Sequence, residues 1–98
     1  MYVLEVMSGP LDGKVWTFER EITIGRDDAV ATACITIDRY ISRKHARLYE
    51  EGDGTLRLAD LASRNGTRVA GRPLADPEAI DPGATFVVGR TTLRVVRS

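Results

Sequence analysis

Apolar and polar residues alternate in several short segments of the chain. The segments Ile22-Thr23-Ile24, Ile35-Thr36-Ile37 and Leu56-Arg57-Leu58 have this period of two, and Ala46-Arg47-Leu48 and Leu93-Arg94-Val95 repeat it. Successive side chains of a strand point to opposite faces, so the alternation predicts strands with one buried face. The period is two rather than the 3.6 residues typical of a helix.

Turn-forming residues separate these segments. They cluster at Ser8-Gly9-Pro10, Asp12-Gly13, Gly52-Asp53-Gly54, Asn65-Gly66, Gly71-Arg72-Pro73 and Asp81-Pro82-Gly83. Turn signals at this density leave almost no space for helices. The pattern therefore predicts an all-β sandwich whose functional sites lie on loops at one end.

The length of the chain limits it to one core. Its 98 residues are enough for a single domain, which we expect to span residues 1–98. With 43% hydrophobic and 29% charged residues the chain is too apolar to be disordered. No apolar run approaches the roughly 18 residues that cross a membrane, and the N-terminus lacks the features of a signal peptide. We expect a cytoplasmic protein without membrane insertion.

Charge and cysteine content exclude several functions. Fourteen basic residues balance fourteen acidic ones, which argues against a nucleic-acid partner. Twelve of the basic residues are Arg, whose planar fork matches phosphate oxygens, although an arginine-rich genome would produce the same bias. With Cys34 as the only cysteine and His45 as the only histidine, we expect neither a disulfide nor a metal site, and no cofactor.

Two loops carry basic residues beside a strand. Gly25-Arg26 follows a predicted strand and, taken alone, is typical of a flexible strand end with a solvated arginine. In the second loop, Ser42 precedes Arg43 and Lys44, so a hydroxyl and cationic side chains could converge on a dianion. The alternative is a solvated basic turn.

Ser42 and His45 also raise the possibility of a hydrolase. A serine nucleophile would use the histidine as its base. No Gly-x-Ser-x-Gly elbow surrounds Ser42, and no carboxylate is evidently placed to orient His45. We therefore expect a protein that is not an enzyme.

The third loop, Asp60–Thr67, contains Asn65-Gly66, the strongest short hairpin signal. Its simplest interpretation is a type I′ turn that joins two strands. The Asn side chain carries both an amide donor and a carbonyl acceptor, so Asn65 could also hold the main chain of an extended peptide. The two interpretations are compatible.

The order of these motifs resembles the forkhead-associated (FHA) family. Gly-Arg at 25–26, Ser-Arg-x-His at 42–45 and Ser-x-Asn-Gly-Thr at 63–67 are followed by a terminal strand entered through Gly89. The likeness extends from the Ser8–Gly13 segment to Thr92–Val96, nearly the whole chain. It implies about eleven short strands in two twisted, mainly antiparallel sheets, with loops at one edge that bind phosphothreonine.

The resemblance assigns a role to each matching residue. Arg26 corresponds to the phosphate-binding arginine of the family and Ser42 to its phosphate-binding hydroxyl. Arg43 occupies the variable place after that serine, where the family often adds a contact. Asn65 corresponds to the asparagine that holds the peptide main chain, and Arg64 stands where a residue often helps to bind phosphate.

Other matching residues are expected to support the site. Gly25, His45 and Gly66 correspond to architectural positions, with His45 ordering the loop that presents Ser42 and Gly66 permitting a turn. The chain departs from the family at Val69-Ala70-Gly71, where a second Asn-Gly is frequent. We expect Ala70 to loosen that turn without touching the phosphate site.

Two functions remain open on the sequence. The first is a signalling module whose partner is a phosphothreonine-containing protein, either a Ser/Thr kinase or its substrate. The alternative is a scaffold or oligomerisation domain that keeps the FHA fold without recognising phosphate. Intact Arg26, Ser42 and Asn65 favour the first.

Overall fold

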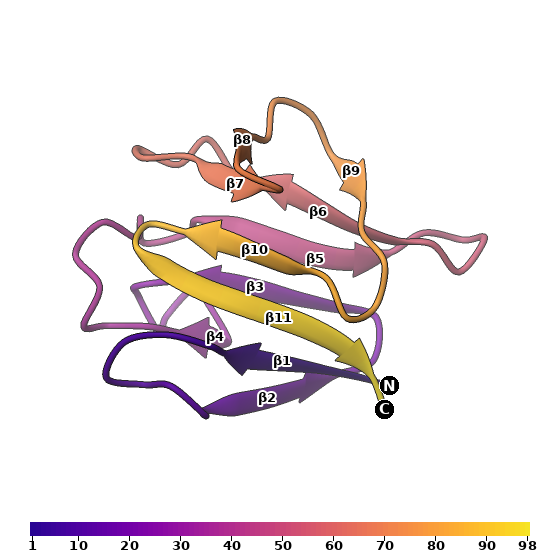
Figure 1. Ribbon diagram of the computed structural model, residues 1–98, viewed down its shortest axis with the longest axis horizontal. Coiled ribbons are helices and arrows are strands. Elements are labelled where there is room, and N and C mark those ends of the chain that lie inside the picture. Colours follow the sequence, from indigo (N-terminus) through magenta and orange to yellow (C-terminus); the bar gives the residue numbers. More distant parts are fainter.

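Two β-sheets face each other in the computed structural model, which describes all 98 residues (Figure 1). The strands are β1 (Tyr2–Val6), β2 (Val15–Phe18), β3 (Glu21–Gly25), β4 (Ala33–Cys34), β5 (Ala46–Glu50), β6 (Leu56–Asp60), β7 (Thr67–Val69), β8 (Arg72–Pro73), β9 (Glu78–Ala79), β10 (Thr85–Val88) and β11 (Thr91–Arg97). The expected all-β sandwich of eleven strands is confirmed. The structure contains no helix long and apolar enough to cross a membrane.

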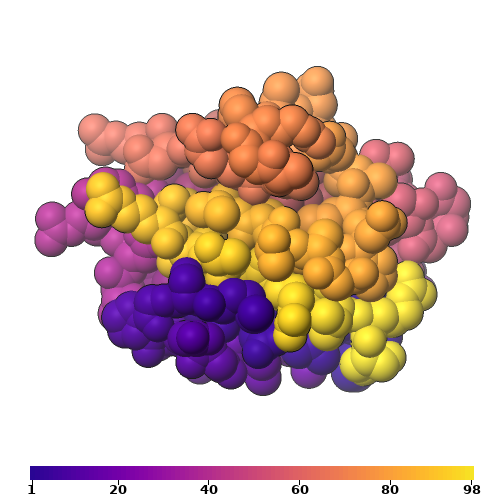
Figure 2. Space-filling model, viewed as in Figure 1, coloured from indigo at the N-terminus to yellow at the C-terminus, as the bar shows by residue number.

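The strand order places distant segments side by side. One sheet has the order β2-β1-β11-β10-β7-β8 and the other β4-β3-β5-β6-β9. All neighbours are antiparallel except β3 and β4, which are parallel. The first and last strands pair from Tyr2 opposite Arg97 to Val6 opposite Leu93, and Figure 2 shows these two ends of the sequence packed against each other.

The core lies between the sheets and follows the alternation in the sequence. In β1 the residues Tyr2, Leu4 and Val6 are buried, while Val3 and Glu5 are partly exposed. The same period in β3, β5, β6, β10 and β11 supplies most of a cluster of 19 buried residues, and loop residues such as Ile41 and Leu74 supply part of the rest. Burial of each large aliphatic side chain stabilises the fold by roughly 1.5–3 kcal/mol, so this apolar layer holds the two sheets together.

The prediction of a strand at Ile35-Thr36-Ile37 is wrong. Strand β4 consists of Ala33 and Cys34 only, and Ile37 has 53% of its surface exposed. After Ile35, whose N–H donates to the Gly25 carbonyl, the chain leaves the sheet. The Asp38 carboxylate ties this segment to the β10–β11 turn of the other sheet, accepting hydrogen bonds from Arg90 N–H and Thr91 Oγ1. This contact between distant residues overrides the local alternation.

The prediction of a type I′ hairpin at Asn65-Gly66 is also wrong. The strands on either side, β6 and β7, belong to different sheets, so this loop crosses between them. Gly66 has a φ of 82°, whereas Asn65 does not have the positive φ that a type I′ turn requires. The two-residue turn with positive φ at both positions is instead Ala70-Gly71, at 52° and 78°, between the paired residues Val69 and Arg72.

Replacing Ala70 with Asn should stabilise the domain. Ala70 holds a left-handed conformation that costs a residue with a Cβ roughly 1 kcal/mol, and Asn tolerates it better. We expect a gain of about 0.5–1 kcal/mol, or several degrees in the melting temperature. Thermal unfolding followed by circular dichroism measures it.

The control is Arg68→Asn on the exposed face of β7, which should not raise the melting temperature. A melting temperature for Ala70→Asn equal to or below that of the wild type would contradict the assigned turn.

Candidate functional site

Antiparallel pairing brings the three sequence motifs to one end of the sandwich. Strand β3 ends beside the start of β5, because Ile24 pairs with Ala46, and β6 ends there too, because Ala46 pairs with Asp60. Loops β3–β4, β4–β5 and β6–β7 therefore emerge together, at the end opposite the termini (Figure 1). The β1–β2 loop and the β10–β11 turn lie at the same end.

Arg26 is held by its backbone and by one guanidinium nitrogen. Its N–H donates to the carbonyls of Ser42, at 3.0 Å, and Arg43, at 3.2 Å. Its Nε donates to the Ile41 carbonyl at 3.0 Å. The side chain is exposed and forms no salt bridge, so its two terminal nitrogens remain for a ligand. Both ends of Arg26 are thus fixed to the β4–β5 loop.

Gly25 is required by this close approach between loops. A Cβ at Gly25 would lie 2.0 Å from the Arg43 carbonyl oxygen, the atom that accepts from Arg26 N–H. Any side chain at this position would separate the β3–β4 loop from the β4–β5 loop. Glycine is therefore required at position 25 by lack of space for a side chain, and not by backbone conformation, because Gly25 has no positive φ.

The hydroxyl of Ser42 makes one hydrogen bond within the protein and can make another. Its Oγ accepts the Arg64 N–H at 2.9 Å, which leaves the hydroxyl proton free to be donated. Its own N–H donates to His45 Nδ1 at 3.0 Å. The backbone N–H of Ser42 is consequently not available to a ligand, although its hydroxyl is.

His45 is completely buried and joins two loops. Its Nδ1 accepts from Ser42, so in the neutral ring Nε2 carries the proton and donates to the Gly66 carbonyl at 2.8 Å. Both ring nitrogens are occupied by backbone groups. His45 is therefore not placed as a base for the Ser42 hydroxyl, and its support of a ligand site stays a prediction.

Asp60 shapes the β6–β7 loop, and sequence reasoning missed it. Its carboxylate accepts hydrogen bonds from Ser63 N–H at 3.0 Å, Ser63 Oγ at 2.5 Å and Thr67 Oγ1 at 2.7 Å. Ser63 Oγ in turn accepts the Gly66 N–H at 2.9 Å. An Asp three residues before a Ser is a local signal for such a turn and could have identified it.

Hydrogen bonding also changes the acidity of Asp60. Partial burial by itself would raise the pKa of Asp60, but the hydrogen bonds from Ser63 and Thr67 outweigh it, so the pKa lies below its ordinary value. The ionised carboxylate is the form that the loop stabilises.

Asn65 is anchored beside the other motifs. Its Nδ2 donates to the Tyr40 carbonyl at 2.8 Å, which leaves the side-chain oxygen free to accept from a peptide N–H. Asn65 also lines a hollow of about 300 Å³ together with Arg39, Tyr40 and Arg64. Tyr40 and Arg39 were not predicted as site residues, because nothing in their local sequence marks them.

The structure brings all five predicted ligand contacts to this end. Arg26, Ser42 and Asn65 are connected through the β4–β5 loop, and the exposed side chains of Arg43 and Arg64 flank them.

The loops at this end carry cations without salt bridges, beside the carboxylates of Asp12, Asp27, Asp28 and Asp38. The four arginines in salt bridges with Glu, namely Arg47, Arg57, Arg72 and Arg94, all lie on strands. The loop cations at this end form no such pair: Lys14, Arg26, Arg39, Arg43, Lys44, Arg64 and Arg90. Uncompensated cations around free hydrogen-bond donors are the arrangement that binds a phosphate group.

Replacing Asp60 with Asn should reduce the loss of stability in acid. Because the folded-state pKa is lowered, the wild-type carboxylate stabilises the fold fully above its unfolded-state pKa of about 3.9, and this stabilisation disappears as pH falls through the folded-state pKa. The variant should be less stable at neutral pH and depend less on pH. Melting temperatures from about pH 7 to pH 2.5 test this.

The exposed residue Asp76 provides a control, since Asp76→Asn should keep the acid dependence of the wild type. Parallel curves for Asp60→Asn and the wild type would show that Asp60 has no such role.

Comparison with known proteins identifies relatives of this fold. The family model described as "FHA domain" matches residues 22–89. No curated protein sequence matches the chain. Among solved structures, the FHA domain of the CT664 protein from Chlamydia trachomatis is 26% identical, with a TM-score of 0.87 over 99% of this chain and 97% of that one.

Two further structures are similar to the same degree. An FHA domain of an Arabidopsis thaliana protein is 26% identical, with a TM-score of 0.88 over 99% of this chain and 86% of that one. The FhaA FHA domain, solved in complex with the intracellular domain of Rv3910, is 26% identical, with a TM-score of 0.81 over 97% of this chain and 99% of that one.

Proposed function

Because the chain belongs to the FHA domain family, we propose that it is a phosphopeptide-binding module that recognises phosphothreonine. The partner is a protein modified by a Ser/Thr kinase, or the kinase itself, in the cytoplasm. One similar structure, 26% identical with a TM-score of 0.82, comes from work on phosphothreonine-dependent FHA domain interactions, which supports this ligand class.

One observation carries the proposal: the free donors and acceptors of the site are all anchored to the segment Tyr40–Arg43. Arg26 is bonded to the carbonyls of Ile41, Ser42 and Arg43, and Asn65 to the carbonyl of Tyr40. Ser42 within the segment retains its hydroxyl proton. Because these side chains are already fixed, they lose little conformational entropy when a ligand binds.

Each free group matches one part of a phosphothreonine peptide. The phosphate carries nearly two negative charges and strong acceptor oxygens, which suit the terminal nitrogens of Arg26 and the hydroxyl of Ser42. Arg43 and Arg64 add positive charge at the rim. The free oxygen of Asn65 accepts a main-chain N–H of the extended peptide.

Calorimetry with matched peptides tests the ligand class. We expect micromolar affinity for a suitable phosphothreonine peptide, roughly −7 to −9 kcal/mol, because few residues form the site. The unphosphorylated peptide should not bind measurably, and a phosphoserine peptide should bind more weakly. A scaffold that ignores phosphate would treat all three alike.

Arg26→Ala should remove most of the binding. A charge-assisted contact to phosphate in a partly desolvated site contributes roughly 2–5 kcal/mol, and Arg26→Lys should recover only part of it because an ammonium lacks the planar fork. Calorimetric titrations of the variants measure these effects.

Wild-type affinity should also fall as pH drops through about 6, where the phosphate loses its second charge. Calorimetric titrations of the wild type at a series of pH values measure this fall.

Arg20→Ala is the matched control. Arg20 is an exposed arginine without a salt bridge, located between β2 and β3 at the opposite end of the sandwich. Its removal should leave affinity unchanged. If Arg26→Ala instead binds within about threefold of the wild type, less than 1 kcal/mol, the phosphate site is assigned wrongly.

Substitutions at Asn65 and Gly66 should affect different properties, peptide binding in the first case and stability of the fold in the second. Asn65→Ala should weaken peptide binding while the protein still unfolds cooperatively, because its side chain is exposed and only one bond to Tyr40 is lost. Gly66→Val should lower the melting temperature, since a β-branched residue tolerates a φ of 82° badly. The reverse pattern in binding assays and thermal melts would contradict both roles.

A further inference from the structure

One residue of the β6–β7 loop has an unfavourable backbone conformation. Ala62 has a φ of 56°, in the left-handed region that a residue with a Cβ rarely adopts. The only other non-glycine residue with a positive φ is Ala70, which belongs to the tight turn between β7 and β8. Ala62 lies in no such turn, because its loop crosses from one sheet to the other. Backbone strain of this kind persists only where the surrounding contacts hold it.

Hydrogen bonds on both sides of Ala62 hold this conformation. Before it, Leu61 N–H donates to the His45 carbonyl at 2.8 Å, which continues the pairing of β5 with β6 beyond the end of β6. After it, Ser63 N–H and Ser63 Oγ donate to the Asp60 carboxylate at 3.0 and 2.5 Å. The chain therefore turns back at Ala62 to bring Ser63 within reach of Asp60.

The Asp60 carboxylate binds both ends of the loop. Besides the two groups of Ser63 it accepts Thr67 Oγ1 at 2.7 Å. Partial burial opposes its ionisation, but these hydrogen bonds keep the pKa of Asp60 below the ordinary value, so the group is ionised at neutral pH. Hydrogen bonds to an ionised acceptor are roughly twice as strong as those between neutral groups. Two such bonds to Ser63 outweigh the cost of one left-handed residue.

The residues after this turn face the proposed ligand site. Arg64 N–H donates to Ser42 Oγ at 2.9 Å, and Asn65 Nδ2 donates to the Tyr40 carbonyl at 2.8 Å. Both acceptors belong to the β4–β5 loop. The turn at Ala62 thus brings two groups of the β6–β7 loop against the loop that carries the phosphate-binding hydroxyl.

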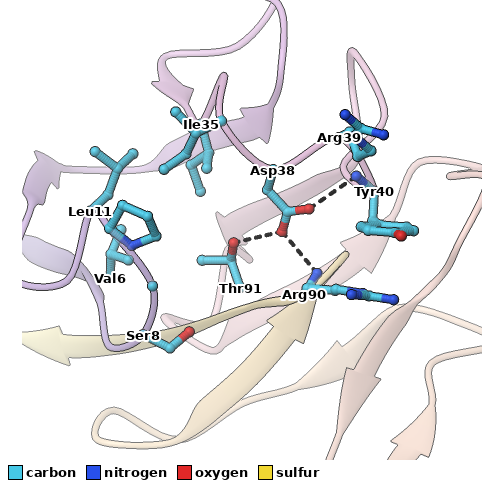
Figure 3. Close-up of a pocket in the computed structure, with 12 residues that line it drawn as sticks. Val6, Ser8, Leu11, Ile35, Asp38, Arg39, Tyr40, Arg90 and Thr91 are labelled. Atoms are coloured by element: carbon cyan, nitrogen blue, oxygen red, sulfur yellow. Dashed lines mark hydrogen bonds between the residues drawn. The ribbon is translucent and has the colours of Figure 1, made fainter.

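The acceptor of Asn65 is fixed independently of the β6–β7 loop. Tyr40 N–H donates to the Asp38 carboxylate at 2.9 Å, and the same carboxylate accepts Arg90 N–H and Thr91 Oγ1 at the β10–β11 turn (Figure 3). The Tyr40 carbonyl therefore has a fixed place. The position of Asn65 relative to it depends on how the β6–β7 loop is held.

The Ser63 hydroxyl connects Asp60 to the ligand residues of the loop. Its Oγ donates to Asp60 and accepts Gly66 N–H at 2.9 Å, so it closes the loop on both sides of Arg64 and Asn65. Ser63 is half-buried and takes no part in the proposed ligand contacts. A change at Ser63 therefore alters how the ligand residues are held without removing a group that binds.

We propose that Asp60 is a positioning residue for phosphopeptide binding. Through Ser63 it keeps Ala62 in the left-handed conformation, and this strained turn holds Asn65 where its oxygen accepts the main chain of the peptide. The inference rests on the proposed function. Affinity then depends on a carboxylate that does not touch the ligand, because the loop is ordered before the peptide arrives.

Calorimetric titration with a phosphothreonine peptide, well below the melting temperature of each variant, tests this role. Ser63→Ala removes the donor to Asp60 and the acceptor of Gly66 N–H, so binding should weaken about tenfold. Ser63→Thr keeps the hydroxyl and should bind within about twofold of the wild type. Asp60→Asn should weaken binding at least as much as Ser63→Ala, since an amide has one acceptor oxygen where the carboxylate has two.

A second substitution separates positioning from general stability. Asn adopts the left-handed conformation more readily than Ala, so adding Ala62→Asn to Ser63→Ala should raise the population of the competent loop and recover about threefold in affinity. Ala70→Asn is the matched control, because it relieves the same strain at the other end of β7. In the Ser63→Ala background it should raise the melting temperature without recovering affinity.

Hydrogen exchange in the free protein reports the loop without any ligand. The Arg64 amide, which is bonded to Ser42 Oγ, should exchange faster in Ser63→Ala than in the wild type and at an unchanged rate in Ser63→Thr. A loss of affinity in Ser63→Ala with unchanged Arg64 exchange would show that the loop is not the route, and the inference would be wrong.

The remaining outcomes distinguish the inference from the proposed function. If Ser63→Ala binds as tightly as Ser63→Thr, or if Ala70→Asn recovers as much affinity as Ala62→Asn, Asp60 does not position the site, while phosphopeptide recognition by the wild type stands. If the wild type itself binds no phosphopeptide, the proposed function fails and the inference fails with it.

Discussion

The site depends on the imidazole of His45, which is buried between two loops from different parts of the chain. It accepts the N–H of Ser42 and donates to the carbonyl of Gly66. An unpaired buried polar group costs roughly 1–3 kcal/mol, so the ring holds the β4–β5 and β6–β7 loops at a fixed distance. Together with the bonds from Arg64 N–H to Ser42 Oγ and from Asn65 Nδ2 to the Tyr40 carbonyl, the ring sets the separation of Ser42 from Asn65.

The sandwich and the ligand loops use different interactions. The strands hold together by alternating apolar burial, and four of their six arginines form salt bridges with glutamates, as with Arg47 and Glu21. The loops hold together by hydrogen bonds to backbone carbonyls, which occupy the backbone but leave side-chain cations unpaired. A neutral protein can in this way present cations without salt bridges at one end, because the pairing of Arg with Glu on the strands does not extend to the loops.

Prediction from sequence succeeded where local pattern and tertiary structure agree. Alternation located β3, β5, β6 and part of β11, since a half-buried strand has that pattern wherever it lies. It failed at Ile35–Ile37, where Asp38 attaches the chain to a turn more than 50 residues away. It also failed at Asn65-Gly66, because turn propensity does not reveal whether the strands on either side share a sheet.

The sequence by itself determined the fold class, the family likeness and the chemical groups of the site, because these depend on residue types and their order. Tertiary structure alone decided that Arg26, Ser42 and Asn65 meet around the segment Tyr40–Arg43 and that Asp60 shapes the β6–β7 loop. The physical reason is that these contacts depend on strand register and on loops from both sheets, and no local pattern of residues encodes either.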